Sequence, residues 1–354
     1  MRTPARRVLR TDHVSARLTA CAAVAALIGC SRTGLLVGGA GGADNQTPPI
    51  FPACVADSAR LDVPRLAVYI LFDTSKSMSW SGQWEGATSA LSTFFGDPKN
   101  GGLDVALRLF PATGCDAQSC DAIGCAVPTV DAAPLMEAGA PEDLHEAALN
   151  AAVAKAEPAG NTPMYPAMEG AFLWADGYRR ATDGNRAAVV LVTDGEPSGC
   201  NNHVKDLVKL VSRGLEGGTR TFVVGLAGTN QTVDDRIAEA GGTGSARMVG
   251  LEDTATELAA TLDAIRDAAL VCTFAIPASL STIDPATTNV SSVGPHGDVT
   301  TLHRVAGASS CATGAGWYFE DASFQTVTLC PASCDDAARG VTDRLYVTQG
   351  CASL

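Results

Sequence analysis

The segment "ILFDTSKSMSW", residues 70–80, changes from apolar to polar within a few residues. Asp73, Ser75 and Ser77 occupy alternate positions directly after an apolar run that is typical of a buried strand. Because side chains alternate along an extended chain, these three should point in the same direction. The sequence therefore predicts a carboxylate and two hydroxyls gathered at the end of one strand.

The chain around this segment alternates between strand-like and helix-like stretches. Apolar residues recur at helical spacing in the intervening stretches, for example Val204, Leu207, Val208 and Val211. Short, nearly continuous apolar runs suit strands that are buried on both faces, and they occupy residues 66–72, 105–110, 187–193 and 221–227, with a weaker run at 246–251. This alternation predicts an α/β fold over residues 61–271, with a doubly wound parallel sheet and helices on both faces.

Two further groups of polar residues should lie near Asp73. Ligands of doubly wound sheets bind beyond the carboxyl ends of the strands, and Asp194 directly follows the strand 187–193. A helix over 164–180 has to start at that same edge, which places Thr162 there as well. Carboxylate and hydroxyl oxygens are hard donors, so the set predicts a site for Mg²⁺, with Mn²⁺ and Ca²⁺ as alternatives.

The pattern Asp73-x-Ser75-x-Ser77, followed by Thr162 and Asp194-Gly195, resembles the metal-ion-dependent adhesion site of von Willebrand factor type A domains. The resemblance covers about residues 61–271, with all five site positions in the order of the family. It implies a mostly parallel sheet with one short antiparallel edge strand. It also implies hydroxyls that touch the metal, aspartates that act directly or through water, and a partner carboxylate that completes the coordination. The alternative is that these residues only cap helices and turns.

The first 29 residues have the pattern of an export signal. They carry five arginines and one acid, and the apolar run 18–28 is too short to span a bilayer. The run ends at Gly29-Cys30, which resembles the lipobox of bacterial lipoproteins. We therefore expect a lipid anchor on Cys30, a flexible tether over 30–60, and a location in the cell envelope, at the outer membrane. The alternative is a plain secretory signal, with Cys30 an ordinary thiol.

The charge of the chain excludes several functions. The chain of 354 residues has 25 basic and 38 acidic residues; without the signal 20 and 37 remain, a net charge of −17. Such a surface repels nucleic acid and anionic membranes.

Gly-x-Ser-x-Gly, His-Glu-x-x-His and P-loop motifs are absent from the sequence, and we expect no enzyme. We expect a metal-dependent adhesion protein whose partner presents an Asp or Glu. The alternatives are a structural envelope protein with a bracing metal and a metal-assisted hydrolase.

Ten cysteines remain after the signal and Cys30, which allows five disulfides in an oxidising compartment. We expect Cys54 to pair with Cys272, since both flank the predicted domain. One of Cys115, Cys120 and Cys125 should pair with Cys200, and the other two with each other. Residues 272–354 change in character and predict a small, cysteine-rich β module. Two bridges are expected within it, and a tetrahedral zinc site is the alternative for the same four residues, Cys311, Cys330, Cys334 and Cys351.

Overall fold

Residues 49–353 are described in a computed structural model, except for residues 62, 81, 182–184, 271, 281–282, 295, 312–313, 340 and 343. The predicted signal, Cys30 and the first part of the predicted tether therefore lie outside the described residues. Residues Thr47–Leu354 form one compact unit. Within its described residues, every helix is too short or too polar to cross a membrane.

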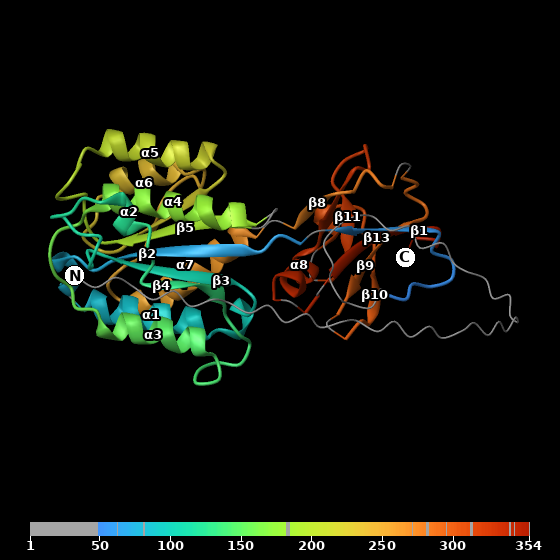
Figure 1. Cartoon of the computed structure of the whole chain (residues 1–354), viewed down its shortest axis with the longest axis horizontal. Helices are drawn as coiled ribbons and strands as arrows, with labels where there is room; N and C mark the ends of the chain where they lie inside the picture. Colours follow the sequence, from blue (N-terminus) through green and yellow to red (C-terminus); the bar gives the residue numbers. More distant parts are fainter. Residues whose placement is uncertain are drawn as a thin grey trace, which may run out of the picture. The chain divides into compact units, whose positions relative to one another are not determined.

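A six-stranded sheet forms the centre of the α/β part, in the order β4-β3-β2-β5-β6-β7 (Figure 1). All neighbouring pairs are parallel except β3 and β4, which are antiparallel. This confirms the predicted doubly wound, mostly parallel sheet with an antiparallel edge strand. The strands are β2 (Leu66–Asp73), β3 (Asp104–Phe110), β4 (Val130–Pro134), β5 (Arg186–Thr193), β6 (Arg220–Gly225) and β7 (Arg247–Met248).

Helices cover both faces of this sheet (Figure 1). One core joins the sheet to α1 (Gln83–Gly96), α3 (Leu144–Lys155) and α7 (Thr254–Ala269). The other core joins it to α4 (Met164–Ala181), α5 (Val204–Glu216) and α6 (Gln231–Ala240). Strand β2 shows why the apolar runs are continuous, because Ile70 packs into the first core and Leu71 into the second. The short helix α2 (Ala122–Cys125) packs against α4.

The order of the strands creates a switch point beside β2. The chain passes from β2 to β3 on one side, and it later places β5 on the other side. The loops that follow β2 and β5 therefore leave the sheet at the same edge, where doubly wound folds bind their ligands. The first loop contains a short 3₁₀ helix, η1 (Lys76–Ser79), which begins after Thr74 and Ser75.

A third core holds the small β module together. Its two antiparallel sheets have the orders β1-β13-β9-β10 and β11-β12-β8, and the buried Trp317 lies in their shared core. The indole of Trp317 donates to the carbonyl oxygen of Leu302, 3.2 Å away. The elements are β1 (Asp57–Leu61), β8 (Thr273–Ala275), β9 (Thr288–Val293), β10 (Val299–Leu302), η3 (Ala308–Ser310), β11 (Trp317–Phe319), β12 (Thr326–Leu329), α8 (Pro331–Ala338) and β13 (Arg344–Gln349). A further 3₁₀ helix of the α/β part is η2 (Pro98–Asn100).

The module contains a strand that we expected in the tether. Strand β1 pairs antiparallel with β13, from Asp57 opposite Gln349 to Leu61 opposite Leu345. Residues 57–61 are thus part of a folded sheet, and the predicted tether boundary at residue 60 is wrong. The prediction failed because β1 is only half buried and pairs within the module, not within the six-stranded sheet.

Strand pairing also explains why two predicted disulfides are wrong. Cys54 pairs with Cys351, because the antiparallel β1 and β13 bring residues 297 positions apart together. Cys272 directly precedes β8, which pairs with β12, and it is bonded to Cys334 of α8. Of the two bridges expected inside the module, only Cys311–Cys330 is present. These disulfides leave no thiolate among the four cysteines for the alternative zinc site.

Candidate functional site

The first loop holds Asp73 in a fixed, fully buried position at the end of β2. Oδ1 of Asp73 accepts a hydrogen bond from the backbone N–H of Ser75, 2.7 Å away. The hydroxyls of Ser75 and Ser77 lie 3.0 Å apart and are hydrogen-bonded to each other. Asp73, Ser75 and Ser77 are therefore gathered in one place, as expected, but the 3₁₀ helix η1 rather than an extended chain brings Ser77 there.

Two hydrogen bonds tie the end of β5 and the third loop, which follows it, to the end of β2 and the first loop. Thr193 donates its hydroxyl to Oδ2 of Asp73 over 2.6 Å. Ser77 donates its hydroxyl to Oδ1 of Asp194 over 2.7 Å. These bonds follow from the parallel register of β2 and β5, in which Phe72 lies beside Val192 and both strands end at the same level. Asp73 and Asp194 thus belong to one buried cluster.

The second loop closes the cluster and carries Thr162. The carbonyl oxygen of Gly160 accepts from the backbone N–H of Lys76 in the first loop, over 3.2 Å. Thr162 and Ser198 of the third loop are joined twice. The N–H of Thr162 donates to the Ser198 hydroxyl, and the N–H of Ser198 donates to the Thr162 carbonyl, each over 2.9 Å. Three loops distant in sequence therefore meet at one edge of the sheet.

The position of Gly195 shows how close the hydroxyls of Ser77 and Thr162 lie. A Cβ atom on Gly195 would be 3.5 Å from the hydroxyl oxygen of Ser77 and 3.6 Å from that of Thr162. Both hydroxyls therefore face the same small space beside Asp194. The structure brings together all five residues that the sequence singled out: Asp73, Ser75, Ser77, Thr162 and Asp194.

Burial makes negative charge costly in this cluster. It raises the pKa of Asp73 to about 7, although hydrogen bonds from Thr193 and Ser75 act in the opposite direction. Burial also raises the pKa of Asp194, against the hydrogen bonds from Ser77 and Gln83. Within the described residues neither aspartate forms a salt bridge with a basic side chain. A cation placed among these oxygens would offset the cost of two buried carboxylates.

The donor set fits a hard divalent cation. It consists of two carboxylates and three hydroxyls, the oxygen ligands that Mg²⁺, Mn²⁺ and Ca²⁺ take in proteins. The described residues contain no group of three or more His, Cys, Asp or Glu side chains placed to hold a metal ion. A cation site here therefore depends on the hydroxyls of Ser75, Ser77 and Thr162 as much as on the two acids.

Several contacts of the cluster were not predicted from the sequence. Gln83 lies six residues after Ser77, at the start of α1, and its side-chain amide donates to Oδ2 of Asp194. Ser198 holds Thr162, and the role of Thr193 is to hold Asp73. The position of Thr193 directly before Asp194 could have revealed that role from the sequence. No periodicity or motif marks Gln83 or Ser198.

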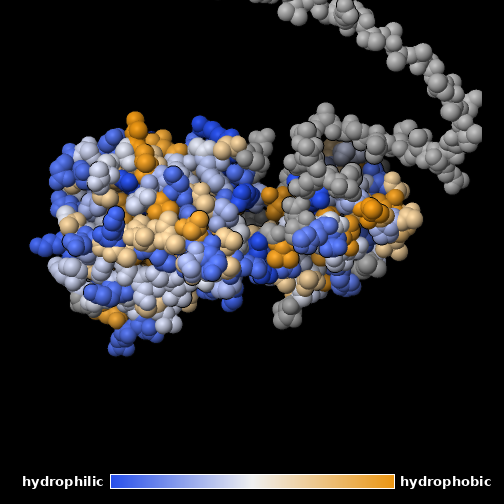
Figure 2. Space-filling view, turned by 60° about the horizontal axis from the view of Figure 1, so that its bottom comes forward, coloured by the Kyte–Doolittle hydropathy of each residue, from blue (hydrophilic) through white to orange (hydrophobic). Residues whose placement is uncertain are grey.

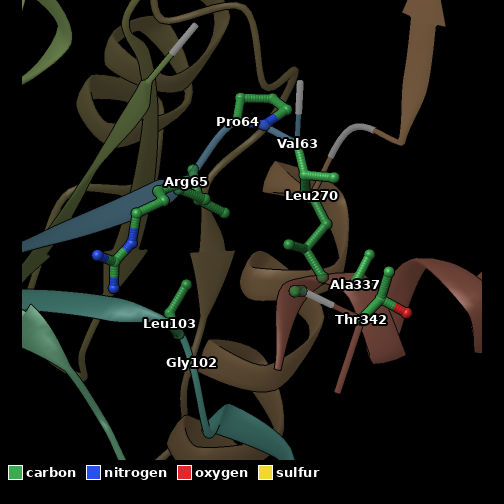
Figure 3. A pocket seen from close by; sticks show the side chains of 10 residues that line it. Val63, Pro64, Arg65, Gly102, Leu103, Leu270, Ala337 and Thr342 are labelled. Carbon is green, nitrogen blue, oxygen red and sulfur yellow. The ribbon is translucent and has the colours of Figure 1, made fainter. Parts of the chain in front are cut away.

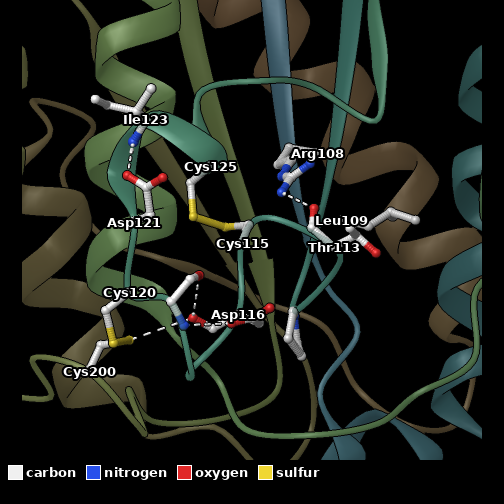
Figure 4. Close-up of a disulfide and its surroundings, with 12 residues drawn as sticks. Arg108, Leu109, Thr113, Cys115, Asp116, Cys120, Asp121, Ile123, Cys125 and Cys200 are labelled. Carbon is white, nitrogen blue, oxygen red and sulfur yellow. Dashed lines mark hydrogen bonds between the residues drawn. A yellow bond between two sulfur atoms is a disulfide. The ribbon is translucent and has the colours of Figure 1, made fainter.

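Two disulfides lie in the connection after β3, and one of them reaches the third loop (Figure 4). Cys115 is bonded to Cys125, and Cys120 is bonded to Cys200. This is one of the pairings that we expected for these four cysteines. The second bond joins the connection after β3 to the loop that carries Ser198, two residues before Cys200. Cys120 and Cys200 both have φ of 47°, in the left-handed region that side chains disfavour.

A separate pocket of about 290 Å³ lies at the opposite end of β2 (Figure 3). Its walls are mainly apolar and include Leu66, Leu103 and Leu270. Its charged member, Arg65, donates to Oδ1 of Asp104 over 2.9 Å. The described residues that line the pocket include no acid, histidine or cysteine, so the cluster around Asp73 and Asp194 is the candidate site.

No family model matches this chain, and no curated protein matches it in sequence. Similar solved structures include proximal thread matrix protein 1 from the mussel byssus, at 15% identity and a TM-score of 0.38, covering 60% of this chain and 48% of that one. The vWF domain of the type V pili tip protein Mfa5 from Porphyromonas gingivalis has 10% identity and a TM-score of 0.39, with coverages of 60% and 97%. Manganese-loaded Plasmodium vivax TRAP protein has 15% identity and a TM-score of 0.38, with coverages of 57% and 75%.

This chain spans about half the length of the mussel protein. All three TM-scores lie below 0.5 and all three identities below 25%. These similarities therefore carry no argument about function. The interpretation of the site depends on its own geometry.

Proposed function

We propose that the α/β part, from β2 to α7, is a von Willebrand factor type A domain that binds a divalent cation and through it an acidic side chain of a partner protein. The observation that carries this proposal is the pair of hydrogen bonds Ser77–Asp194 and Thr193–Asp73. They gather the oxygens of separate loops into one buried cluster at the edge of the sheet where ligands bind.

Five residues would hold the cation, with Mg²⁺ as the expected ion: Asp73, Ser75, Ser77, Thr162 and Asp194. When bound, the ion supplies a positive charge that attracts a carboxylate of the partner. The two carboxylates balance the formal charge of the ion, and the three hydroxyls add none. A direct bond between the ion and the partner's carboxylate oxygen would offset the repulsion between an acidic partner and an acidic chain.

The surface next to the cluster supports a recognition role. Lys76 and Trp80 are exposed beside Ser77, and the N–H of Trp80 donates to the carbonyl oxygen of Ser77 over 3.0 Å. Trp80 is 65% exposed, which is unusual for a tryptophan, and tryptophan is enriched at the centres of protein interfaces. On the face shown in Figure 2, hydrophilic residues cover most of the α/β part. Recognition by a polar site with one aromatic neighbour fits this surface.

Calorimetric titration of the purified mature chain with Mg²⁺ and Mn²⁺ tests the proposal. We expect one ion per wild-type chain and no binding to Asp73→Ala. Asp321→Ala, which changes an exposed aspartate of the β module, serves as the matched control and should bind as the wild type does. Partner capture that continues unchanged in excess EDTA and in Asp73→Ala would show that the cation does not mediate recognition.

A bracing role for the cation is the second candidate. The loops already hold one another through Ser77–Asp194 and Ser198–Thr162, so a cation could add stability without contacting a partner. In that case Asp73→Ala would lower the melting temperature by several degrees and leave partner capture intact. Under the adhesion proposal, capture is lost together with metal binding.

We also propose that the chain is exported and anchored by a lipid on Cys30. The five disulfides support an oxidising compartment. The anchor depends on the sequence of the first 30 residues alone. Metabolic labelling with a radioactive fatty acid, compared between the wild type and Cys30→Ser, tests it. Equal labelling of both chains would refute the anchor.

A further inference from the structure

Gln83 contacts both the first and the third loop of the candidate site, although it belongs to neither. It is the first residue of α1, and its side chain is buried. Its amide nitrogen Nε2 donates to Oδ2 of Asp194, and it lies 3.4 Å from the carbonyl oxygen of Ser77, to which it also donates. An ionised carboxylate only accepts hydrogen bonds, so the amide must present its NH₂ group to Asp194.

The two oxygens of Asp194 therefore have different partners. Oδ1 accepts from the Ser77 hydroxyl, and Oδ2 accepts from the Gln83 amide. Two donors on opposite oxygens fix the rotation of the carboxylate, which a single donor would leave free to turn. The donor on Oδ2 is neutral, so it orients Asp194 without placing a positive charge where a cation would bind.

We propose that Gln83 is a positioning residue that sets the affinity of this site for its divalent cation; the inference rests on the function proposed above. Outer partners that orient metal ligands typically change metal affinity by about 10–100-fold when they are removed. Gln83 fits that role for Asp194. It is buried and is the first residue of α1, a helix that packs into the core. Both acceptors of its amide, Oδ2 of Asp194 and the carbonyl oxygen of Ser77, belong to site residues.

The test is the affinity of Gln83→Met for Mn²⁺, measured by calorimetry on the full mature chain. Methionine keeps the length of the side chain and removes both N–H donors. We expect the Kd for Mn²⁺ to rise about tenfold or more. Melting temperatures with EDTA and with saturating Mn²⁺ separate positioning from packing. A residue that only packs would lower both temperatures equally and leave the Kd unchanged.

Gln231→Met is the matched control. Gln231 is the first residue of α6, as Gln83 is of α1, but its side chain is exposed. The Kd of this variant should equal that of the wild type.

Gln83→Glu provides a second measurement that does not depend on the folding of Gln83→Met. It adds a third carboxylate to the cluster, next to Asp194. Because a bound cation would relieve the added repulsion, Mn²⁺ should raise the melting temperature of this variant more than that of the wild type. Equal shifts in the two proteins would refute the contact between residues 83 and 194.

The outcomes distinguish the two proposals. A wild-type chain that binds no Mn²⁺ contradicts the proposed function itself. A wild-type chain that binds Mn²⁺, with Gln83→Met binding it within twofold of the wild type, contradicts only the role of Gln83.

Discussion

Thr193 donates its hydroxyl hydrogen to Oδ2 of Asp73 over 2.6 Å and so joins the ends of two neighbouring parallel strands. Both residues are fully buried. The bond occupies one oxygen of Asp73, while the N–H of Ser75 occupies the other. The carboxylate at the centre of the candidate site is therefore held by its own strand end and by the strand beside it.

Replacing Thr193 with valine should destabilise the protein, because a buried carboxylate loses a donor and no water replaces it. We expect the free energy of unfolding to fall by roughly 1–3 kcal/mol, measured by urea denaturation. Thr221→Val is the matched control, since the buried hydroxyl of Thr221 has no hydrogen-bond partner among the described residues. That variant should be neutral or slightly more stable. An equal loss in both variants would mean that the bond to Asp73 contributes nothing.

The disulfide between Cys120 and Cys200 should matter for both stability and the site. It joins residues 80 positions apart, and the chain-entropy relation predicts a loss of roughly 4 kcal/mol in Cys120→Ser/Cys200→Ser. Mn²⁺ affinity should also fall, because the freed loop carries Ser198, which holds Thr162. Cys311→Ser/Cys330→Ser, in the β module, is the control; it should lower stability and leave affinity unchanged. Equal affinities in the two double variants would contradict the link to Thr162.

Asp234 should make stability depend on pH. Burial raises the pKa of this aspartate from 3.8 to about 6, and the charges of Asp235 and Glu196 add to the effect, while a hydrogen bond from Thr229 opposes it. Between these two pH values the folded chain keeps a proton that the unfolded chain has released. The free energy of unfolding therefore falls as the pH rises through this range, and it stays lower at pH 7.

Asp234→Asn removes this cost and should be more stable than the wild type at pH 7, by roughly 1–3 kcal/mol. The asparagine oxygen keeps an acceptor for Thr229. Urea denaturation at pH 4 and pH 7 measures the effect, with the exposed Asp131→Asn as the control. A difference from the wild type that is the same at both pH values would show that Asp234 does not titrate in this range.

Trp80 should contribute to partner recognition rather than to folding. Its side chain is 65% exposed, so Trp80→Ala should change the free energy of unfolding by no more than about 0.5 kcal/mol. Retention of proteins that the wild type binds with Mg²⁺ and releases with EDTA should fall strongly. Leu144→Ala is the control, because Leu144 is an equally apolar and exposed residue, 78% exposed, that lies away from the site. It is the first residue of α3, and the chain reaches the site only after the last residue of that helix. Retention that falls equally in both variants would indicate a nonspecific apolar effect.

The sequence predicted the α/β part well because its signals are local. Strand β2 is buried on both faces, so seven consecutive apolar residues before Asp73 marked it without knowledge of any neighbour. The alternation of strands and helices fixed the direction of each strand, and hence the edge at which Asp73, Thr162 and Asp194 meet. The β module was harder, because β1 and β13 are paired across almost the whole chain and β1 is only half buried.

The sequence by itself determined which oxygens gather at the sheet edge, because parallel strands must end on the same side. Only the tertiary structure decided that Gln83 holds Asp194, that Ser198 holds Thr162, and that Cys54 and Cys272 have separate partners. Those contacts depend on how helices and strands distant in sequence pack against one another. No local pattern encodes them, because each requires two segments to be placed in space before their side chains can meet.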